Sequence, residues 1–198
     1  MVRLAESAEG YGVGVSLVTE SDAEEITELV HRNLSHLQGH MPWALDEPTT
    51  SADRRVMIKG WLADWKDGGD AVYAIRLEGE SQIRGACGIH NRIGPRALEI
   101  GYWLSKDSEG MLIITRAAAI ATGLAFELDD IESVEIHHDK ANLKSGKVPE
   151  RLGFTRISEA PDSATTRLAK KDLGVSVTWR MQRSAWNGYQ LPEIWDPR

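Results

Sequence analysis

The chain has 198 residues, of which 41% are hydrophobic and 27% charged, and its formal net charge is −7. This is the composition of an ordinary globular protein, and no run approaches the roughly 18 apolar residues that a membrane helix requires, so we expect no membrane association. The negative charge disfavours nucleic acid, whose binding depends on neutralised phosphates, and mildly favours cationic partners such as amines.

Two features predict a cytoplasmic protein. Residues 1–14 lack the basic leader and the apolar run of a secretory signal. Cys87 is the only cysteine, which excludes an internal disulfide and is typical of a reducing compartment. Its neighbours supply no activating base, so we interpret it as a small buried hydrophobe. Without repeats or linkers, residues 1–198 are expected to form a single domain, with a core at about 13–183 and a C-terminal tail at 184–198.

The first half of the sequence predicts a strand, two helices and three more strands. Residues 13–19 alternate as a strand does, and Ser21 with Glu24 forms a capping box that would open a helix. A second helix is expected at 52–66. Its apolar residues recur at helical spacing: Met57, Trp61, Leu62 and Trp65. The runs 71–77, 82–90 and 97–104, separated by short turns, are typical of an antiparallel meander.

The second half predicts two helices and three strands. An alanine-rich helix with one buried face is expected from about residue 113 to 128. A strand follows at 131–138, then a short helix at 142–152 stopped by Gly153, and the last strands at 154–158 and 175–183. The fold class is therefore α/β (α+β), with a mixed, mostly antiparallel sheet flanked by helices.

The strand at 97–104, the loop with Gly110 and the helix that begins near Ile113 form a unit suited to anion binding, because N–H groups at a helix N-terminus hold phosphate. A plain turn into a core helix is the alternative. The segment E-I-G-Y-W-L at 99–104, then Gly110 and T-R-A at 115–117, resembles the coenzyme-binding core of RimJ/RimL-type GNAT N-acetyltransferases. N-L-K-S at 142–145 and V-P-E-R-L-G-F at 148–154 are similar to a second segment of that family.

The resemblance implies a sheet that splays between its fourth and fifth strands, 97–104 and 131–138, with acetyl-CoA as cosubstrate in the gap and no metal. Main-chain groups of three residues would hold the pantetheine and the acetyl carbonyl: Tyr102, Trp103 and Leu104. The pyrophosphate would lie on the loop and first helical turn: Gly110, Met111, Leu112, Ile113, Ile114 and Thr115. Asn142 and Ser145 would contact the coenzyme from the opposite lip.

The phosphate loop departs from the family pattern at two positions. The family has a second glycine where this chain has Leu112, and commonly a basic or polar residue where it has Met111. A left-handed backbone at Leu112 would cost of order 1 kcal/mol. Either the loop takes another path around Leu112, or coenzyme binding is weakened.

Two side chains are the first candidates for the chemistry. Glu99 lies just before the expected acetyl site, where it could act as the base directly or through one water, and where the resembling family commonly has a glutamate. The alternative is an ion pair with Arg84 or Arg92 across the sheet. Ser145 is the family-typical hydroxyl near the leaving sulfur, or else it caps the short helix.

Other candidates carry weaker arguments. Successive strand residues point to opposite faces, so the run H-H-D at 137–139 does not predict a metal site. His138 shares parity with the apolar Val134 and Ile136, which makes it the inward histidine, either a secondary acid/base or hydrogen-bonded structure. Trp43 lies between the first two helices, where it would line the acceptor groove or belong to the core.

The predicted function is transfer of an acetyl group from acetyl-CoA to a primary amine, with a protein or peptide N-terminal amine as the first acceptor. A small-molecule amine, such as an antibiotic or a polyamine, is the alternative acceptor. The altered loop also permits a non-catalytic binding module. A second copy of the chain, forming a homodimer, is a further candidate partner.

Overall fold

The computed structural model describes residues 3–163 and 165–189, in which eight strands form one sheet in the order β1-β2-β3-β4-β5-β6-β8-β7. The strands are β1 (Ser7–Gly10), β2 (Val13–Leu17), β3 (Ala71–Leu77), β4 (Ile83–His90), β5 (Ala97–Leu104), β6 (Ser133–Asp139), β7 (Thr155–Pro161) and β8 (Val175–Gln182). All neighbours are antiparallel except β5 and β6, which run parallel. The α/β (α+β) fold class is confirmed.

Five α-helices accompany the sheet: α1 (Ala23–Arg32), α2 (Leu34–Leu37), α3 (Ser51–Lys66), α4 (Ile113–Phe126) and α5 (Leu143–Arg151). Helix α4 packs on the inner face of β1, β2, β4 and β5, while α1 and α3 pack together on the other face against β3 and β4. Among the described residues, no helix combines the length and the apolar content needed to cross a membrane. Of the expected tail at 184–198, residues 190–198 lie outside the described residues.

Three predictions about the N-terminal half were wrong in detail. Strand β1 was not predicted, because its four residues are half-buried or exposed and show no apolar run. The capping box before α1 joins Thr19 to Asp22, not Ser21 to Glu24, and it opens a short 3-10 turn that leads into the helix. The core face of α3 is formed by Arg54, Ile58 and Trp65, whereas Met57 points outward with 41% of its surface exposed.

Helix α4 is buried almost all round, where the sequence predicted one buried face. It contacts the sheet from the edge strand β1 across to β6, and it also contacts helix α5. Small side chains allow this close packing on both sides. Because the helix is fixed from both sides, its N-terminus holds a set position beside the end of β5.

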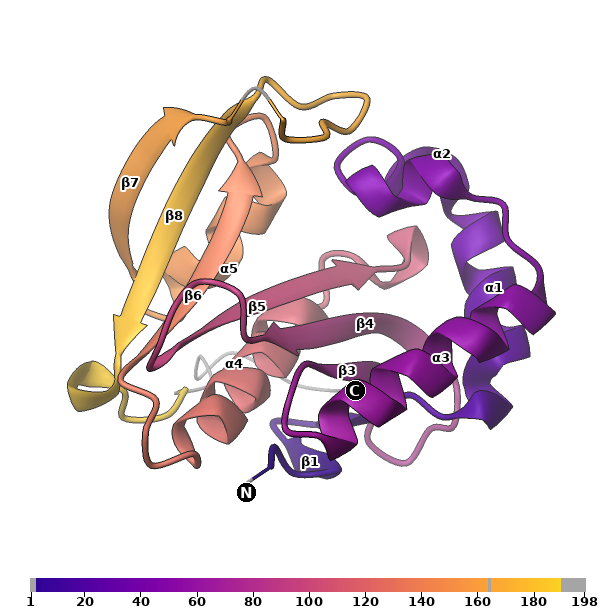
Figure 1. The fold of residues 1–198 in the computed structure, drawn as a ribbon, viewed down its shortest axis with the longest axis horizontal. Helices are drawn as coiled ribbons and strands as arrows, with labels where there is room; N and C mark the ends of the chain where they lie inside the picture. The colour runs from indigo at the N-terminus through magenta and orange to yellow at the C-terminus, as the bar shows by residue number, and fades with distance from the viewer. Residues whose placement is uncertain (1–2, 164, 190–198) are drawn as a thin grey trace.

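The predicted splay between the strands at 97–104 and 131–138 is confirmed. Strands β5 and β6 pair over three residues only, from Ala97 opposite Ser133 to Glu99 opposite Glu135. Beyond this point they part, and Figure 1 shows the arrowhead of β5 pointing toward α2 while β6, β8 and β7 turn away from it. The remaining length of β5 therefore offers a free backbone edge.

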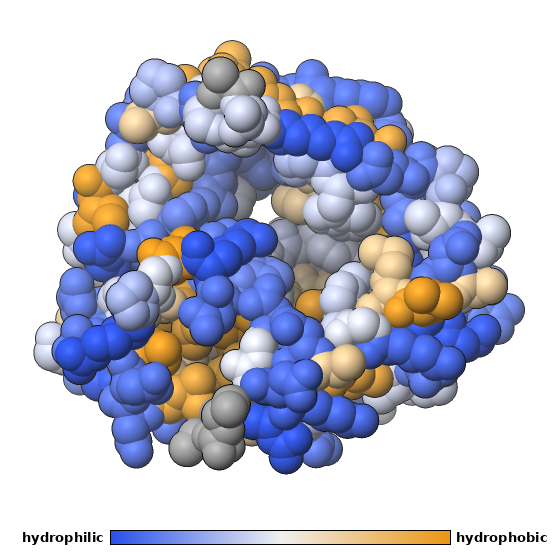
Figure 2. Space-filling model, in the orientation of Figure 1, coloured by the Kyte–Doolittle hydropathy of each residue, from blue (hydrophilic) through white to orange (hydrophobic). Residues whose placement is uncertain are grey.

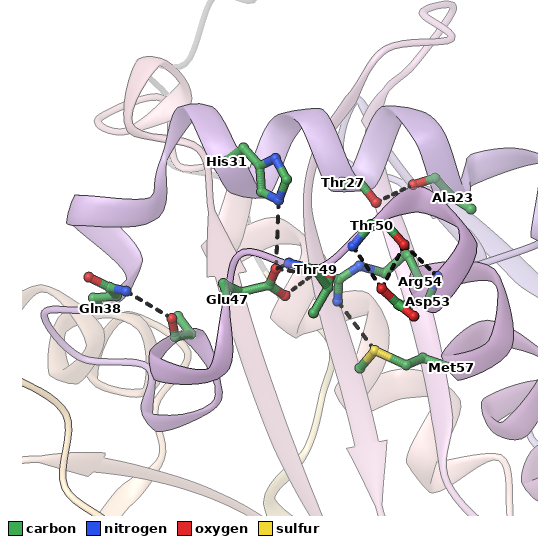
Figure 3. Close-up of polar contacts among 11 residues, drawn as sticks. Ala23, Thr27, His31, Gln38, Glu47, Thr49, Thr50, Asp53, Arg54 and Met57 are labelled. Atoms are coloured by element: carbon green, nitrogen blue, oxygen red, sulfur yellow. Dashed lines mark hydrogen bonds and ion pairs between the residues drawn. The ribbon is translucent and has the colours of Figure 1, made fainter.

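A buried ion pair fixes the segment between α2 and α3. The carboxylate of Glu47 and the guanidinium of Arg54 bond to each other with 3% of either side chain exposed. Glu47 also accepts from the N–H and hydroxyl of Thr49, at 2.7 and 2.9 Å, and lies 3.8 Å from His31 of α1 (Figure 3). The network joins this segment, which carries Trp43, to both helices of its face.

We expect Arg54→Met to lower the free energy of unfolding by about 3–5 kcal/mol, because it leaves the Glu47 carboxylate buried without its cation. Urea denaturation at pH 7 measures the change. The adjacent exposed Arg55 offers a matched control, and Arg55→Met is expected to change stability by no more than about 0.5 kcal/mol. Equal losses in the two variants would contradict the role given to this pair.

The same pair predicts a pH dependence. Burial works to raise the pKa of Glu47, but the hydrogen bonds from Arg54 and Thr49 outweigh it, so the pKa lies below its ordinary value of 4.5. A lowered pKa stabilises the fold fully above pH 4.5, and this stabilisation is lost as the pH falls through the folded-state pKa. The stability difference between wild type and Glu47→Gln should therefore be constant from pH 7 to 5 and shrink in more acidic urea titrations. A stability difference that grows on acidification would contradict a lowered pKa of Glu47.

Candidate functional site

A cleft of about 770 Å³ opens where β5 and β6 part. Nearly all of the residues expected to bind coenzyme line it: Tyr102, Trp103, Leu104, Gly110, Leu112, Ile113, Ile114, Thr115, Asn142 and Ser145. Met111 is not part of the lining and is 49% exposed. The sequence did not single out the other wall, which α2 and its following turn provide with His36, His40 and Met41.

The loop at Gly110 keeps the turn that a second glycine would favour. Gly110 has φ +81°, and Leu112 itself takes the left-handed conformation, with φ 56° and ψ 11°. The loop therefore does not take another path around Leu112. A leucine in this conformation costs roughly 1–2 kcal/mol, which the surroundings must supply.

Arg116, one turn into α4, braces this loop from inside. Its side chain is 1% exposed and donates to the carbonyl oxygens of Met111 at 2.6 Å, Tyr11 at 2.8 Å and Leu112 at 3.4 Å. These bonds hold the loop carbonyls toward the core. Sequence analysis gave Arg116 no role, because a lone arginine in an alanine-rich helix carries no recognisable spacing.

The start of α4 fits an anionic ligand. The N–H groups of a first helical turn have no intrahelical partners. Thr115, in that turn, is fully buried, and its hydroxyl oxygen is without a hydrogen-bond partner among the described residues although it lines the cleft. Across the cleft, α5 presents three cations: Lys144, Lys147 and Arg151. A phosphate here would meet the positive end of the helix dipole and these cations, of which Lys144 and Lys147 also pair with Glu109 and Glu150.

Tyr102 and Ser145 join the two lips of the cleft. The Tyr102 hydroxyl donates to the Ser145 carbonyl at 3.0 Å and accepts from the Ser145 hydroxyl at 3.3 Å. The helix cap is Asn142, whose side chain accepts from the Ser145 N–H at 3.2 Å, so Ser145 does not itself cap α5. Burial raises the pKa of Tyr102 far above its usual range, and the bond with Ser145 offsets only part of that rise. The phenol is therefore a proton donor, not a base.

Glu99 lies on the face of β5 opposite to α4 and is paired. The Arg92 guanidinium donates to both of its carboxylate oxygens, one at 2.9 Å, while Arg84 pairs with Glu80 instead. Burial works to raise the pKa of Glu99, but Arg92 outweighs it and the pKa lies below its ordinary value. Glu99 is outside the cleft lining, and its role as the base stays a prediction.

His138 is directed to the α5 side, as its parity predicted. The Trp179 indole N–H donates to Nε2 at 3.1 Å, so Nδ1 carries the proton and donates to the Asp139 carbonyl at 2.8 Å. A Cβ on Gly146 of α5 would lie 2.9 Å from Nε2, which shows how closely the helix covers the ring. Burial lowers the pKa of His138. Both ring nitrogens are thus occupied, as in a structural histidine.

The loop before β8 and the turn after α2 are joined by backbone hydrogen bonds, and together they form a roof over one part of the cleft. In the loop before β8, the N–H groups of Lys170 and Lys171 donate to the carbonyls of Gln38 and Gly39 at 3.0 and 2.9 Å. Below it, the rings of Trp43 and Trp103 lie 6.0 Å apart. Figure 2 shows a deep opening at the centre of this face.

The buried cysteine and the possibility of a metal site remain to be considered. Burial raises the pKa of the Cys87 thiol to about 12, which fits a buried hydrophobe and not a nucleophile. Within the described ranges 3–163 and 165–189, no three His, Cys, Asp or Glu side chains are grouped so as to hold a metal ion.

Comparison with known proteins assigns the chain to a family. The acetyltransferase (GNAT) domain family matches residues 13–155. The Bacillus subtilis (strain 168) protein "Putative ribosomal N-acetyltransferase YdaF" is 29% identical over 178 residues, 89% of this chain and 94% of that protein. The crystal structure of a "Probable acetyltransferase" is 27% identical with a TM-score of 0.78, covering 91% of this chain and 98% of that one. RimL, the ribosomal L7/L12 alpha-N-protein acetyltransferase solved with coenzyme A, has a TM-score of 0.77 at 20% identity, with the same coverage. The chain therefore belongs to the GNAT acetyltransferase family and transfers an acetyl group from acetyl-CoA to an amine.

Proposed function

We propose that the acceptor is the α-amine at the N-terminus of a protein or peptide. The relationship to a protein named as a ribosomal N-acetyltransferase carries this proposal, since it spans nearly the full length of both chains. The roof over the cleft supports it. The backbone bonds from Lys170 and Lys171 to Gln38 and Gly39 restrict access to the cleft, which favours an extended chain end over a folded surface. Cytoplasmic location, a single domain and a homodimer remain predictions.

The described residues suggest how acetyl-CoA would lie. Its pyrophosphate would meet the backbone N–H groups in the first turn of α4, across the cleft from the cations of α5. Its pantetheine amides would pair with the free edge of β5 near Tyr102, since backbone N–H and C=O groups need partners when buried. Asn142 and Ser145 would contact it from the opposite lip. Because the loop at Leu112 keeps its turn, the reason for considering a non-catalytic module is removed.

The chemistry then requires two proton movements. The amine nitrogen attacks the thioester carbonyl carbon, a C–N bond forms, the C–S bond breaks, and coenzyme A leaves as a thiolate that must be protonated. The Tyr102 and Ser145 hydroxyls, 3.3 Å apart and spanning the cleft, are the groups we propose for that protonation. A base must accept the proton that the ammonium loses before attack, and the second proton, lost by the nitrogen as the C–S bond breaks, restores the hydroxyl that protonated the thiolate.

The acceptor class is tested by thiol release from acetyl-CoA. We expect a peptide with a free α-amine and no lysine to be acetylated, and the same peptide with a blocked N-terminus and one internal lysine to be inactive. Spermidine and an aminoglycoside serve as small-molecule acceptors. A small amine with the highest kcat/KM would contradict the peptide proposal while leaving acetyl transfer itself intact.

Coenzyme affinity tests the loop. Because Leu112 already holds the required turn, Leu112→Gly should leave the Kd for acetyl-CoA within about threefold, whereas Leu112→Val should weaken it about tenfold, since β-branched residues strongly disfavour positive φ. Isothermal titration calorimetry measures both. A large gain in affinity for Leu112→Gly would show that leucine obstructs the bound conformation.

A further inference from the structure

A histidine and an aspartate form a dyad at the end of β4, on the same sheet face as Glu99. The Nδ1 atom of His90 lies 2.6 Å from Oδ2 of Asp70, the residue just before β3. The second oxygen of Asp70 accepts from the N–H of Asn91 at 2.8 Å, so the carboxylate is held in place. An ionised carboxylate can only accept, so Nδ1 carries the proton and Nε2 is left with its lone pair.

Two glycines leave space for the Nε2 atom of His90 above the strands β4 and β5. Gly88 of β4 and Gly101 of β5 are directly opposite each other. A Cβ on Gly88 would collide with Nε2 of His90, and one on Gly101 would lie 3.5 Å from it. The imidazole therefore occupies the space that a side chain on Gly88 would take, and it reaches van der Waals distance of Gly101.

The dyad stands beside the wall of the cleft, although His90 and the two glycines are not themselves among its lining residues. Glu99 is the last residue of β5 that pairs with β6, and Gly101 follows two residues later. The next residues, Tyr102 and Trp103, line the cleft. The His90 side chain is 20% exposed, so it is open to a substrate or to one bridging water.

Glu99 is less suited to the same task. It lies directly opposite His90 in the register and is neutralised by Arg92. A carboxylate whose pKa is lowered binds a proton weakly near neutral pH, so Glu99 is a poor acceptor for the proton of an ammonium. Other charged groups near this face are His137 of β6, paired with Glu135, and Arg180 of β8 on the same carboxylate.

We propose that His90 is the general base of acetyl transfer and that Asp70 positions it. Nε2 takes one proton from the acceptor ammonium, directly or through one water, and the freed amine attacks the thioester. The resulting tetrahedral adduct loses the thiolate and a second proton, which together yield coenzyme A as the thiol. His90 then releases its proton to solvent. This assignment deepens the proposed function and holds for any amine acceptor.

The test compares pH profiles of kcat for two variants, using the amine in the panel with the highest rate. His90→Gln is expected to lower kcat about 10²- to 10⁴-fold at pH 7 and to remove the acidic limb, with the Kd for acetyl-CoA unchanged. Asp70→Asn should lower kcat less and move that limb to lower pH, because loss of the carboxylate destabilises the imidazolium. A purely structural role would not move the limb.

Two further variants complete the design. His31→Gln, on α1, is the matched histidine control, and Glu99→Gln tests the competing assignment: its pH profile should keep the acidic limb if His90 is the base. A His90→Gln rate within threefold of wild type, or loss of the limb in Glu99→Gln instead, would overturn the proposal. Should His90→Gln not fold, an unshifted limb in Asp70→Asn would also overturn it. If peptides alone are not acetylated, only the proposed acceptor class is refuted, and the role of His90 still stands.

Discussion

Strands β5 and β6 are held together by three residue pairs and then separate, and the arrangement of the site follows from that short ladder. Its last pair places the carboxylates of Glu99 and Glu135 side by side, and like charges directly opposite oppose pairing. Each is bound by its own arginine, Arg92 and Arg180. Further along, Tyr102 contacts Ser145 of α5 in place of a β6 residue. The backbone of β5 thus stays available to a ligand that carries its own amide groups.

The separation of β5 and β6 also determines which groups surround a ligand bound to β5. Helix α4 begins at one lip and α5 at the other, so two helix N-termini, with Thr115 and Asn142 in or beside their first turns, face the same space. The opposite sheet face contributes Gly101 and the groups beside it. On the proposed assignment, donor and acceptor substrates would approach the same point of β5 from different sides, which suits a direct transfer without a covalent enzyme intermediate.

The sequence predicted the elements well where periodicity and turn residues agreed. The meander, the alanine-rich helix and the helix capped by Asn142 lie within a few residues of their expected positions, and the two motifs around Gly110 and Asn142 line one cleft. It could not show what depends on distant contacts. The buried face of α3 includes Arg54 because this side chain pairs with Glu47, and the spacing of apolar residues along the helix does not predict such a pair. That Leu112 accepts a left-handed conformation depends on Arg116. His90 and Asp70 are 20 residues apart, and a bulge at Ile75 and Arg76 shifts the register that joins their strands.

The strand order has a consequence for synthesis of the protein. Strand β8 lies between β6 and β7, although it is the last of the three to be made. Until residues 175–182 leave the ribosome, β6 and β7 each expose an unpaired edge, and β6 carries the apolar Val134 and Ile136. Exposed edges of this kind are templates for association between chains. This part of the sheet therefore stays open while residues 140–182 are made, and a chain interrupted before residue 175 is left without the strand that closes it.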